Sequence, residues 1–178
     1  GRPGGRSPLL LEDALAQEAR VQVLQVAGGA VADVPGSERA SSFAWDPKGG
    51  GLYFVRPFDG RGWSREDLFV WKPGDLAARQ VGPVLDRDVE AVRFARKSTA
   101  PRVLYSRGAI HEVAVIEAGK APGGPVSEAL SRPGTVWRPG SPVDLLESAP
   151  GGWVYVRGDR PDEVWIAGEK GEPRRLTR

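Results

Sequence analysis

The sequence predicts an all-β protein built from repeated antiparallel sheets, and three observations support this class. The 24 glycines and 16 prolines are scattered among the 178 residues as punctuation between short apolar runs. Three runs with similar flanks begin at Leu52, Val103 and Trp153, which are 51 and 50 residues apart. The runs are rich in Val, Tyr, Phe and Trp without polar interruptions, so both faces of each strand need cover. Stacked sheets provide that cover.

The first unit of the repeat is incomplete. Strands expected at residues 23–26 and 31–34, with Gly28 and Gly29 between them, match the last two strands of the later units. Residues 8–12 supply the second strand, and no first strand is evident before them. The sequence therefore places three strands in the first unit.

The later units are expected to have four strands. In the second unit these lie at 42–45, 52–55, 68–71 and 78–81. The third unit has strands at 91–94, 103–106 and 113–116, and the fourth at 143–146, 153–156, 164–167 and 174–177. We expect one domain over residues 1–178, with approximate repeats at 8–36, 38–83, 86–131 and 134–178. The last three repeats are predicted to be complete.

Four-stranded sheets that recur every 50 residues or so are typical of a β-propeller, in which each sheet is a blade packed face to face on its neighbours. A β-sandwich is the alternative, but two packed sheets do not predict the same flanks at every repeat. About four blades indicate a partial propeller, a four-bladed ring or half of an oligomer. The missing first strand and the absence of methionine favour a piece of a longer protein.

One turn and one strand ending resemble a known family. Residues 43–55, Phe-Ala-Trp-Asp-Pro-Lys-Gly-Gly-Gly-Leu-Tyr-Phe-Val, resemble the strand–turn–strand signature of TolB-like propeller blades, and residues 171–177 are similar to the last strand of such blades. The order Asp46-Pro47-Lys48-Gly49 departs from the family pattern, and the later units keep only Ala100-Pro101 and Ala149-Pro150 at this turn. Such blades occur in the TolB translocation protein and in the N-terminal propeller of prolyl-oligopeptidase-family peptidases. The resemblance implies a binding or gating role in the periplasm or outside the cell.

The composition excludes several classes of partner and of binding site. The formal net charge is +2 with both signs interleaved, so no basic surface for nucleic acid is expected. The absence of cysteine excludes disulfides, thiolate metal sites and a cysteine nucleophile. No apolar stretch approaches the roughly 20 residues that cross a bilayer, so membrane insertion is not expected.

Catalytic motifs are missing from the sequence. The single histidine, His111, is not accompanied by a Gly-x-Ser-x-Gly or a His-Glu-x-x-His motif. Gly49-Gly50-Gly51 precedes a strand rather than a helix, so it is not a phosphate loop. We predict no catalytic residues, no cofactor and no enzymatic activity for this chain.

A charge pattern recurs with the repeat. An arginine follows each second strand, at Arg56, Arg107 and Arg157, and an acid precedes each third strand, at Asp67, Glu112 and Glu163. In a hairpin each arginine should lie beside its own acid, and each pair should contribute about 0.2–1 kcal/mol. Alternatively, the three guanidinium groups form an arc for an acidic partner. The structural interpretation is favoured because each arginine has a local acid.

The connection between the second and third strands of the second unit is the best candidate for a partner contact. Residues 57–65 carry Phe58, Arg61, Trp63 and Arg65, and exposed aromatic and arginine side chains dominate interface energetics. In the alternative, Trp63 folds back onto its own blade.

Asp86, Asp88 and Glu90 alternate, so in a strand their carboxylates would share one face and could hold a calcium ion. The glycine and terminal glutamate of a calcium loop are missing, so a solvated turn is favoured and no metal is predicted.

The sequence thus predicts a non-catalytic propeller module that binds another protein or a peptide. One alternative is the substrate-gating propeller portion of a prolyl-oligopeptidase-family serine peptidase whose catalytic domain lies outside this chain. The other is a propeller that binds a small ligand or a carbohydrate.

Overall fold

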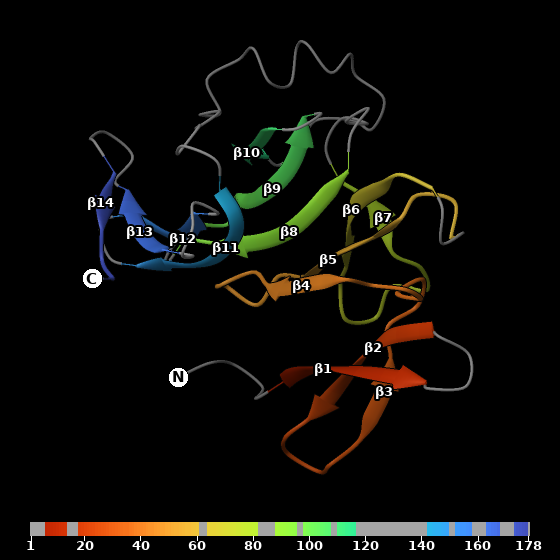
Figure 1. Cartoon of the computed structure of the whole chain (residues 1–178). Coiled ribbons are helices and arrows are strands. Elements are labelled where there is room, and N and C mark those ends of the chain that lie inside the picture. The colour runs from red at the N-terminus through yellow and green to blue at the C-terminus, as the bar shows by residue number, and fades with distance from the viewer. Residues whose placement is uncertain are drawn as a thin grey trace.

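A computed structural model describes residues 6–13, 18–60, 64–81, 88–95, 98–107, 110–116, 142–149, 152–157, 163–167 and 173–177. These residues form strands in four antiparallel sheets that follow one another in chain order, with no helix among them (Figure 1). The described residues accordingly contain no helix that could cross a membrane.

The first sheet has three strands in the order β1-β2-β3. They are β1 (Arg6–Asp13), β2 (Glu18–Gln25) and β3 (Val31–Asp33). All three predicted strands of this unit are present, although β2 begins five residues earlier than its apolar run. Ser37, in the connection to the second sheet, is buried; its Oγ accepts from Val21 N at 2.9 Å and donates to Val21 O at 3.3 Å.

The second sheet contains β4 (Ser42–Trp45), β5 (Leu52–Pro57), β6 (Glu66–Trp71) and β7 (Arg79–Gln80), in chain order. The turn that carries the family resemblance joins β4 to β5. Asp46 Oδ1 accepts from Lys48 N at 2.9 Å, and Asp46 O accepts from Gly49 N at 2.7 Å. Gly49 has φ 75°, a left-handed conformation that glycine adopts without strain. The turn therefore depends on Asp46 and Gly49.

The third sheet contains β8 (Val89–Phe94), β9 (Pro101–Arg107) and β10 (Ile110–Val115), in the order β10-β9-β8. The fourth contains β11 (Pro142–Ala149), β12 (Gly152–Arg157), β13 (Glu163–Ala167) and β14 (Arg174–Arg175). Residues 117–141, where a fourth strand of the third unit would lie, fall outside the described part.

Among the described residues the core consists of three clusters, one between each pair of successive sheets. Val21, Val23 and Val34 of the first unit pack against the second sheet. Val55 and Leu68 pack against β8 and β9 of the third sheet. Tyr155 and Trp165 of the fourth sheet meet Ala91, Leu104 and Val113 of the third.

Alternation along each strand makes this stacking possible. Leu52 and Phe54 of β5 face the first sheet, whereas Val55 faces the third. On β9, Val103 and Tyr105 face the second sheet, and Leu104 faces the fourth. Each fully buried side chain of this size stabilises the fold by about 1.5–3 kcal/mol. Inner sheets covered on both faces confirm the propeller-type stack and exclude a two-sheet sandwich.

Candidate functional site

The β5–β6 hairpin positions the predicted contact loop. Arg56 pairs with Asp67 and Pro57 with Glu66 in the strand register. Beyond them Phe58 N donates to Arg65 O at 2.8 Å, so the loop is closed at its base. Gly60, at φ 73°, donates to Pro57 O at 3.2 Å and turns the chain. Arg61 and Trp63 lie outside the described residues.

A buried carboxylate organises this hairpin. Asp67 is 2% exposed, and its two oxygens accept from Arg65 Nε at 3.0 Å and Arg65 Nη2 at 2.9 Å. Gln80 of β7 donates a third hydrogen bond to Asp67 Oδ2 at 2.9 Å. Burial raises the pKa of Asp67, and the hydrogen bonds and charge of Arg65 oppose that rise. Three donors thus hold Arg65 and β7 to the start of β6.

The predicted ion pair between Arg56 and Asp67 is corrected by this arrangement. The two residues are register partners, as expected, but Arg65 takes the carboxylate. The guanidinium of Arg56 instead lies 3.8 Å from the ring centroid of Phe69, and its Nη1 donates to Pro57 O at 2.8 Å. Burial lowers the pKa of Arg56, and Nε has no hydrogen-bond partner. Arg56 is therefore part of the packing of this hairpin.

The equivalent hairpins differ from one another. In β9–β10, Arg107 lies opposite Ile110 and Glu112 opposite Tyr105, so Arg107 and Glu112 are diagonal neighbours rather than direct register partners, and their ion pair stays a prediction. This offset arises because β10 starts at Ile110, three residues before the apolar run that predicted it. In β12–β13, Arg157 lies opposite Glu163, as predicted. Glu163 Oε1 accepts from Arg175 Nη1 at 2.6 Å. The side chains of Arg107 and Arg157 are not described, so an arginine arc stays a prediction.

Phe58 is the exposed element of the predicted contact loop. Its side chain is 47% exposed, and the Arg65 guanidinium lies 5.2 Å from its ring centroid. Because Arg65 is fixed by Asp67, one side of the ring rests on an immobilised cation while the rest faces solvent. We call Phe58, Arg65, Asp67 and Gln80 the hairpin anchor. The sequence singled out Phe58 and Arg65 but missed the supporting roles of Asp67 and Gln80.

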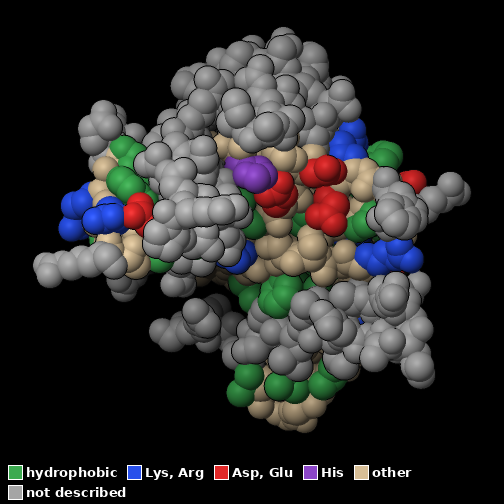
Figure 2. All heavy atoms as spheres, in the orientation of Figure 1, with side chains coloured by type: hydrophobic (Ala, Val, Ile, Leu, Met, Phe, Trp, Pro, Cys, Tyr) green, Lys and Arg blue, Asp and Glu red, His purple; other side chains and the backbone are tan. Residues whose placement is uncertain are grey.

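The alternating acids do not form a metal site in the described part of the chain. Asp88 Oδ1 accepts from Glu66 N at 3.0 Å, and Glu90 Oε1 lies 3.1 Å from His111 Nε2. Asp86 is outside the described residues, and no group of three metal-ligating side chains occurs within them. Figure 2 shows acidic side chains beside the histidine.

These acids nonetheless influence Glu66, whose Oε2 accepts from Ser41 Oγ at 2.9 Å. Burial raises the pKa of Glu66, the hydrogen bond from Ser41 opposes the rise, and the charges of Asp88 and Glu90 add to it. The carboxylates of Glu66 in the second sheet and of Asp88 and Glu90 beside it in the third unit therefore repel one another where the two sheets meet.

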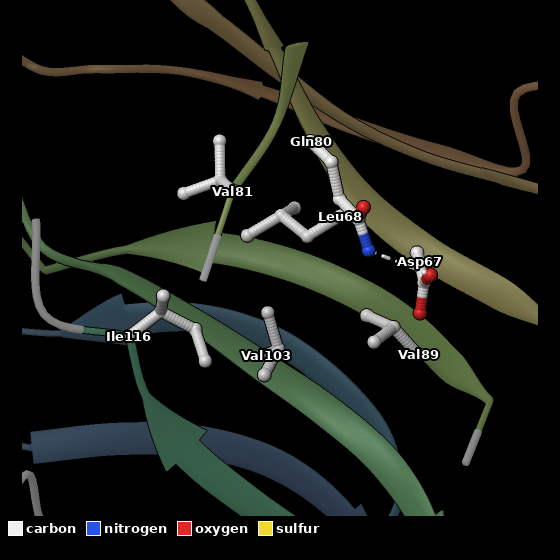
Figure 3. A pocket seen from close by; sticks show the side chains of 7 residues that line it. All are labelled: Asp67, Leu68, Gln80, Val81, Val89, Val103 and Ile116. Carbon is white, nitrogen blue, oxygen red and sulfur yellow. Dashed lines mark hydrogen bonds between the residues drawn. The ribbon is translucent and has the colours of Figure 1, made fainter. Parts of the chain in front are cut away.

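A small pocket lies between the second and third sheets (Figure 3). Apolar side chains line it, with Asp67 and Gln80 at one end joined by their hydrogen bond. Its space is enough for about one water molecule. A metabolite does not fit in this pocket.

Two solved structures resemble this chain. The β-propeller domain of the trilobed protease from Pyrococcus furiosus, which has an open Velcro topology, superposes with a TM-score of 0.57 at 12% identity. The alignment covers 97% of this chain and 53% of that one. An acylaminoacyl peptidase from Pyrococcus horikoshii superposes with a TM-score of 0.56 at 13% identity, over 97% of this chain and 30% of that one.

No protein-family model matches the sequence, and no curated protein matches it significantly. The structural matches establish the fold, and they are to propeller domains of peptidases. The chain spans about half of the trilobed protease propeller. It is therefore a β-propeller-type protein that amounts to a partial propeller.

Proposed function

We propose that this chain is a non-catalytic β-propeller module that binds a protein or peptide through the tip of the β5–β6 hairpin. The observation that carries the proposal is the hairpin anchor. Phe58 is exposed, its ring lies near Arg65, and the buried carboxylate of Asp67 fixes Arg65. Aromatic and arginine side chains that are ordered before binding lose little conformational entropy on contact.

The partner expected at this site offers an apolar side chain to Phe58. The rest of the second sheet supports this role, since β5 and β6 are almost entirely buried and hold the hairpin rigidly. Arg61 and Trp63, in the same loop, would enlarge the contact.

A second candidate is the propeller portion of a prolyl-oligopeptidase-family peptidase, in which blades restrict access to a catalytic domain. Both structural matches are to peptidases, and this favours it. The coding sequence beyond Arg178 distinguishes the two candidates. A hydrolase domain with a Gly-x-Ser-x-Gly motif would support the peptidase, and its absence would remove that candidate.

The binding proposal can be tested with a peptide library displayed on phage and selected on the wild-type chain. Phe58→Ala should weaken binding of the selected peptides at least about tenfold, because it removes the central aromatic contact. Leu76→Ala is the matched control: Leu76 is 96% exposed in the connection between β6 and β7, at the other end of β6 from the hairpin tip.

Both variants should melt within about 2 °C of the wild type, since neither site is buried. Wild-type affinity in Phe58→Ala, or equal losses in the two variants, would place the contact elsewhere.

A further inference from the structure

The carboxylate of Asp67 faces hydrogen-bond donors on both of its oxygens. Oδ1 accepts from Arg65 Nε at 3.0 Å, and Oδ2 accepts from Arg65 Nη2 and from Gln80 Nε2, both at 2.9 Å. The residue is only 2% exposed, so these donors replace most of the water that would solvate its charge. Such a set of donors fits the ionised carboxylate, which is an acceptor only.

A proton on Asp67 is incompatible with this arrangement. A carboxylic acid donates one hydrogen bond, and a guanidinium has no acceptor to receive it. Gln80 can turn its amide and accept the proton from Oδ2, but Arg65 Nη2 then loses its acceptor. Protonation therefore removes the negative charge that holds Arg65 and at least one of the two hydrogen bonds between these side chains.

The surroundings of Asp67 set how readily it takes this proton. Burial favours the protonated form and raises the pKa of Asp67 above its usual 3.8. The charges of Arg65 and of Arg56 on β5 oppose the rise, and the like charge of Asp88, before β8, adds to it. The other side chains that line the pocket beside the carboxylate are uncharged (Figure 3): Leu68, Gln80, Val81, Val89, Val103 and Ile116.

Arg65 connects this carboxylate to the tip of the β5–β6 hairpin. Its guanidinium lies 5.2 Å from the ring centroid of Phe58, and its side chain is 24% exposed. When the hold of Asp67 weakens, the guanidinium can turn towards water, and the Phe58 ring loses the ordered cation beside it. The backbone hydrogen bond from Phe58 N to Arg65 O involves no titratable group, so the base of the loop stays closed.

We propose that Asp67 is a pH-sensitive latch of the hairpin anchor: its carboxylate fixes Arg65 and Phe58 at neutral pH, and its protonation in acid releases them. The consequence for binding rests on the proposed function, because a partner bound at Phe58 would lose affinity as the pH falls.

The latch can open within a folded chain. A pKa that is raised by folding contributes stability that is present in acid and is lost as the pH rises through the raised value. Proton uptake by Asp67 therefore does not by itself unfold the second sheet. Only the side-chain contacts at the hairpin tip change.

Nuclear magnetic resonance of the Arg65 side chain tests the latch without a partner. The Nε–H signal, identified by its loss in Arg65→Lys, should shift and exchange faster with water as the pH is lowered from about 7 to about 3.5. The ring signals of Phe58 should change with the same midpoint. Asp33→Asn is the matched control and should not move the midpoint, because Asp33 pairs with Arg20 on the exposed surface of the first sheet.

Two variants identify Asp67 as the group that titrates. Asp67→Asn imitates the protonated side chain and should give the acid spectrum at every pH. Asp88→Asn removes a like charge but keeps an acceptor for Glu66 N, so it should lower the midpoint by at least about 0.3 pH units. Circular dichroism confirms folding over the pH range, and Asp88→Asn serves alone if Asp67→Asn does not fold.

Three results would overturn the latch. One is an Arg65 signal that stays constant down to the pH at which the chain unfolds. Another is a transition that survives in Asp67→Asn. A third is a midpoint that Asp88→Asn and Asp33→Asn move equally.

The affinity of the phage-selected peptides separates this inference from the proposed function. If both hold, affinity should fall at least about tenfold at the acid end, and Asp67→Asn should bind weakly at every pH. A spectral transition with unchanged affinity would keep the latch and reject the hairpin tip as the contact. Constant spectra with binding that depends on Phe58 would reject the latch and keep the contact.

Discussion

The β5–β6 and β9–β10 hairpins occupy equivalent places in the repeat, yet they join their strands differently. Residues 58–65 separate β5 from β6, whereas only residues 108 and 109 separate β9 from β10. Arg56 consequently lies opposite Asp67, but Arg107 lies opposite Ile110. The apolar runs define the strands, and the length of the connection decides which charged residues meet at its base.

The longer connection also brings an arginine of its own. Arg65 binds Asp67 with two hydrogen bonds and leaves Arg56 to pack on Phe69. The acid at this repeat position is therefore in a buried ion pair in the second sheet, where Asp67 binds Arg65. In the third sheet the equivalent acid, Glu112, has the uncharged Tyr105 as its register partner. Three predictions follow from this contrast between hairpins.

Loss of the Asp67 carboxylate should have the largest effect. Asp67→Ala leaves Arg65 and Gln80 without the acceptor they share in a nearly dry site. We expect the free energy of unfolding in urea to fall by about 2–4 kcal/mol. Glu112→Ala, at the equivalent place in the short hairpin, should cost less than about 1 kcal/mol. Equal losses would mean that both hairpins use their acids alike.

The stability of the chain should depend on pH through Glu66, which lies where the second and third sheets meet beside the longer hairpin. The pKa of Glu66 is raised above its usual 4.5, so the folded chain keeps this proton at pH values where the unfolded chain has lost it. Ionisation of Glu66 therefore lowers stability as the pH rises from the usual pKa through the raised one.

Glu66→Gln removes this loss while keeping an acceptor for Ser41. Relative to the wild type, the variant should gain stability as the pH rises above the usual pKa of 4.5, by less than about 1 kcal/mol because the side chain is half-buried. Melting curves at several pH values measure this, with Glu38→Gln, an exposed glutamate, as control. A gain that shrinks as the pH rises would contradict the expected sign.

The β12–β13 hairpin should show a smaller effect than the β5–β6 hairpin. Glu163 is 21% exposed and its partner Arg175 is 50% exposed, so solvent screens their contact. Glu163→Ala should cost about 0.5–1 kcal/mol, and less at 1 M salt than at about 0.1 M. A loss equal to that of Asp67→Ala would show that the difference in burial does not determine how much each acid contributes to stability.

Strand positions could be predicted from the sequence because continuous apolar runs and glycine-containing turns are local signals. β4 spans the residues predicted for it, and β5 and β12 contain their predicted runs. Strand ends were less predictable: β10 extends three residues before its apolar run because backbone pairing continues through Ile110, His111 and Glu112.

The support of the candidate site could not be predicted in the same way. Phe58 and Arg65 stand out by residue type, but the partner of Arg65 depends on which carboxylate is buried beside it. Gln80, 13 residues beyond Asp67 in the chain, reaches it only because β7 pairs with β6. Ser37 likewise contacts Val21 across 16 residues, a link that no local pattern carries.

The stacking of the sheets also predicts which part of the chain unfolds locally first. An inner sheet shares apolar side chains with two neighbours, so it can open only by breaking two interfaces, whereas the first sheet is held through one cluster and the Ser37 link. In a chain of nearest-neighbour couplings, the end unit exchanges its amide protons first. Covering the face of the first sheet that carries Leu24 and Val31 with another sheet would convert this end into an interior unit, and its amides would then gain protection to match the rest.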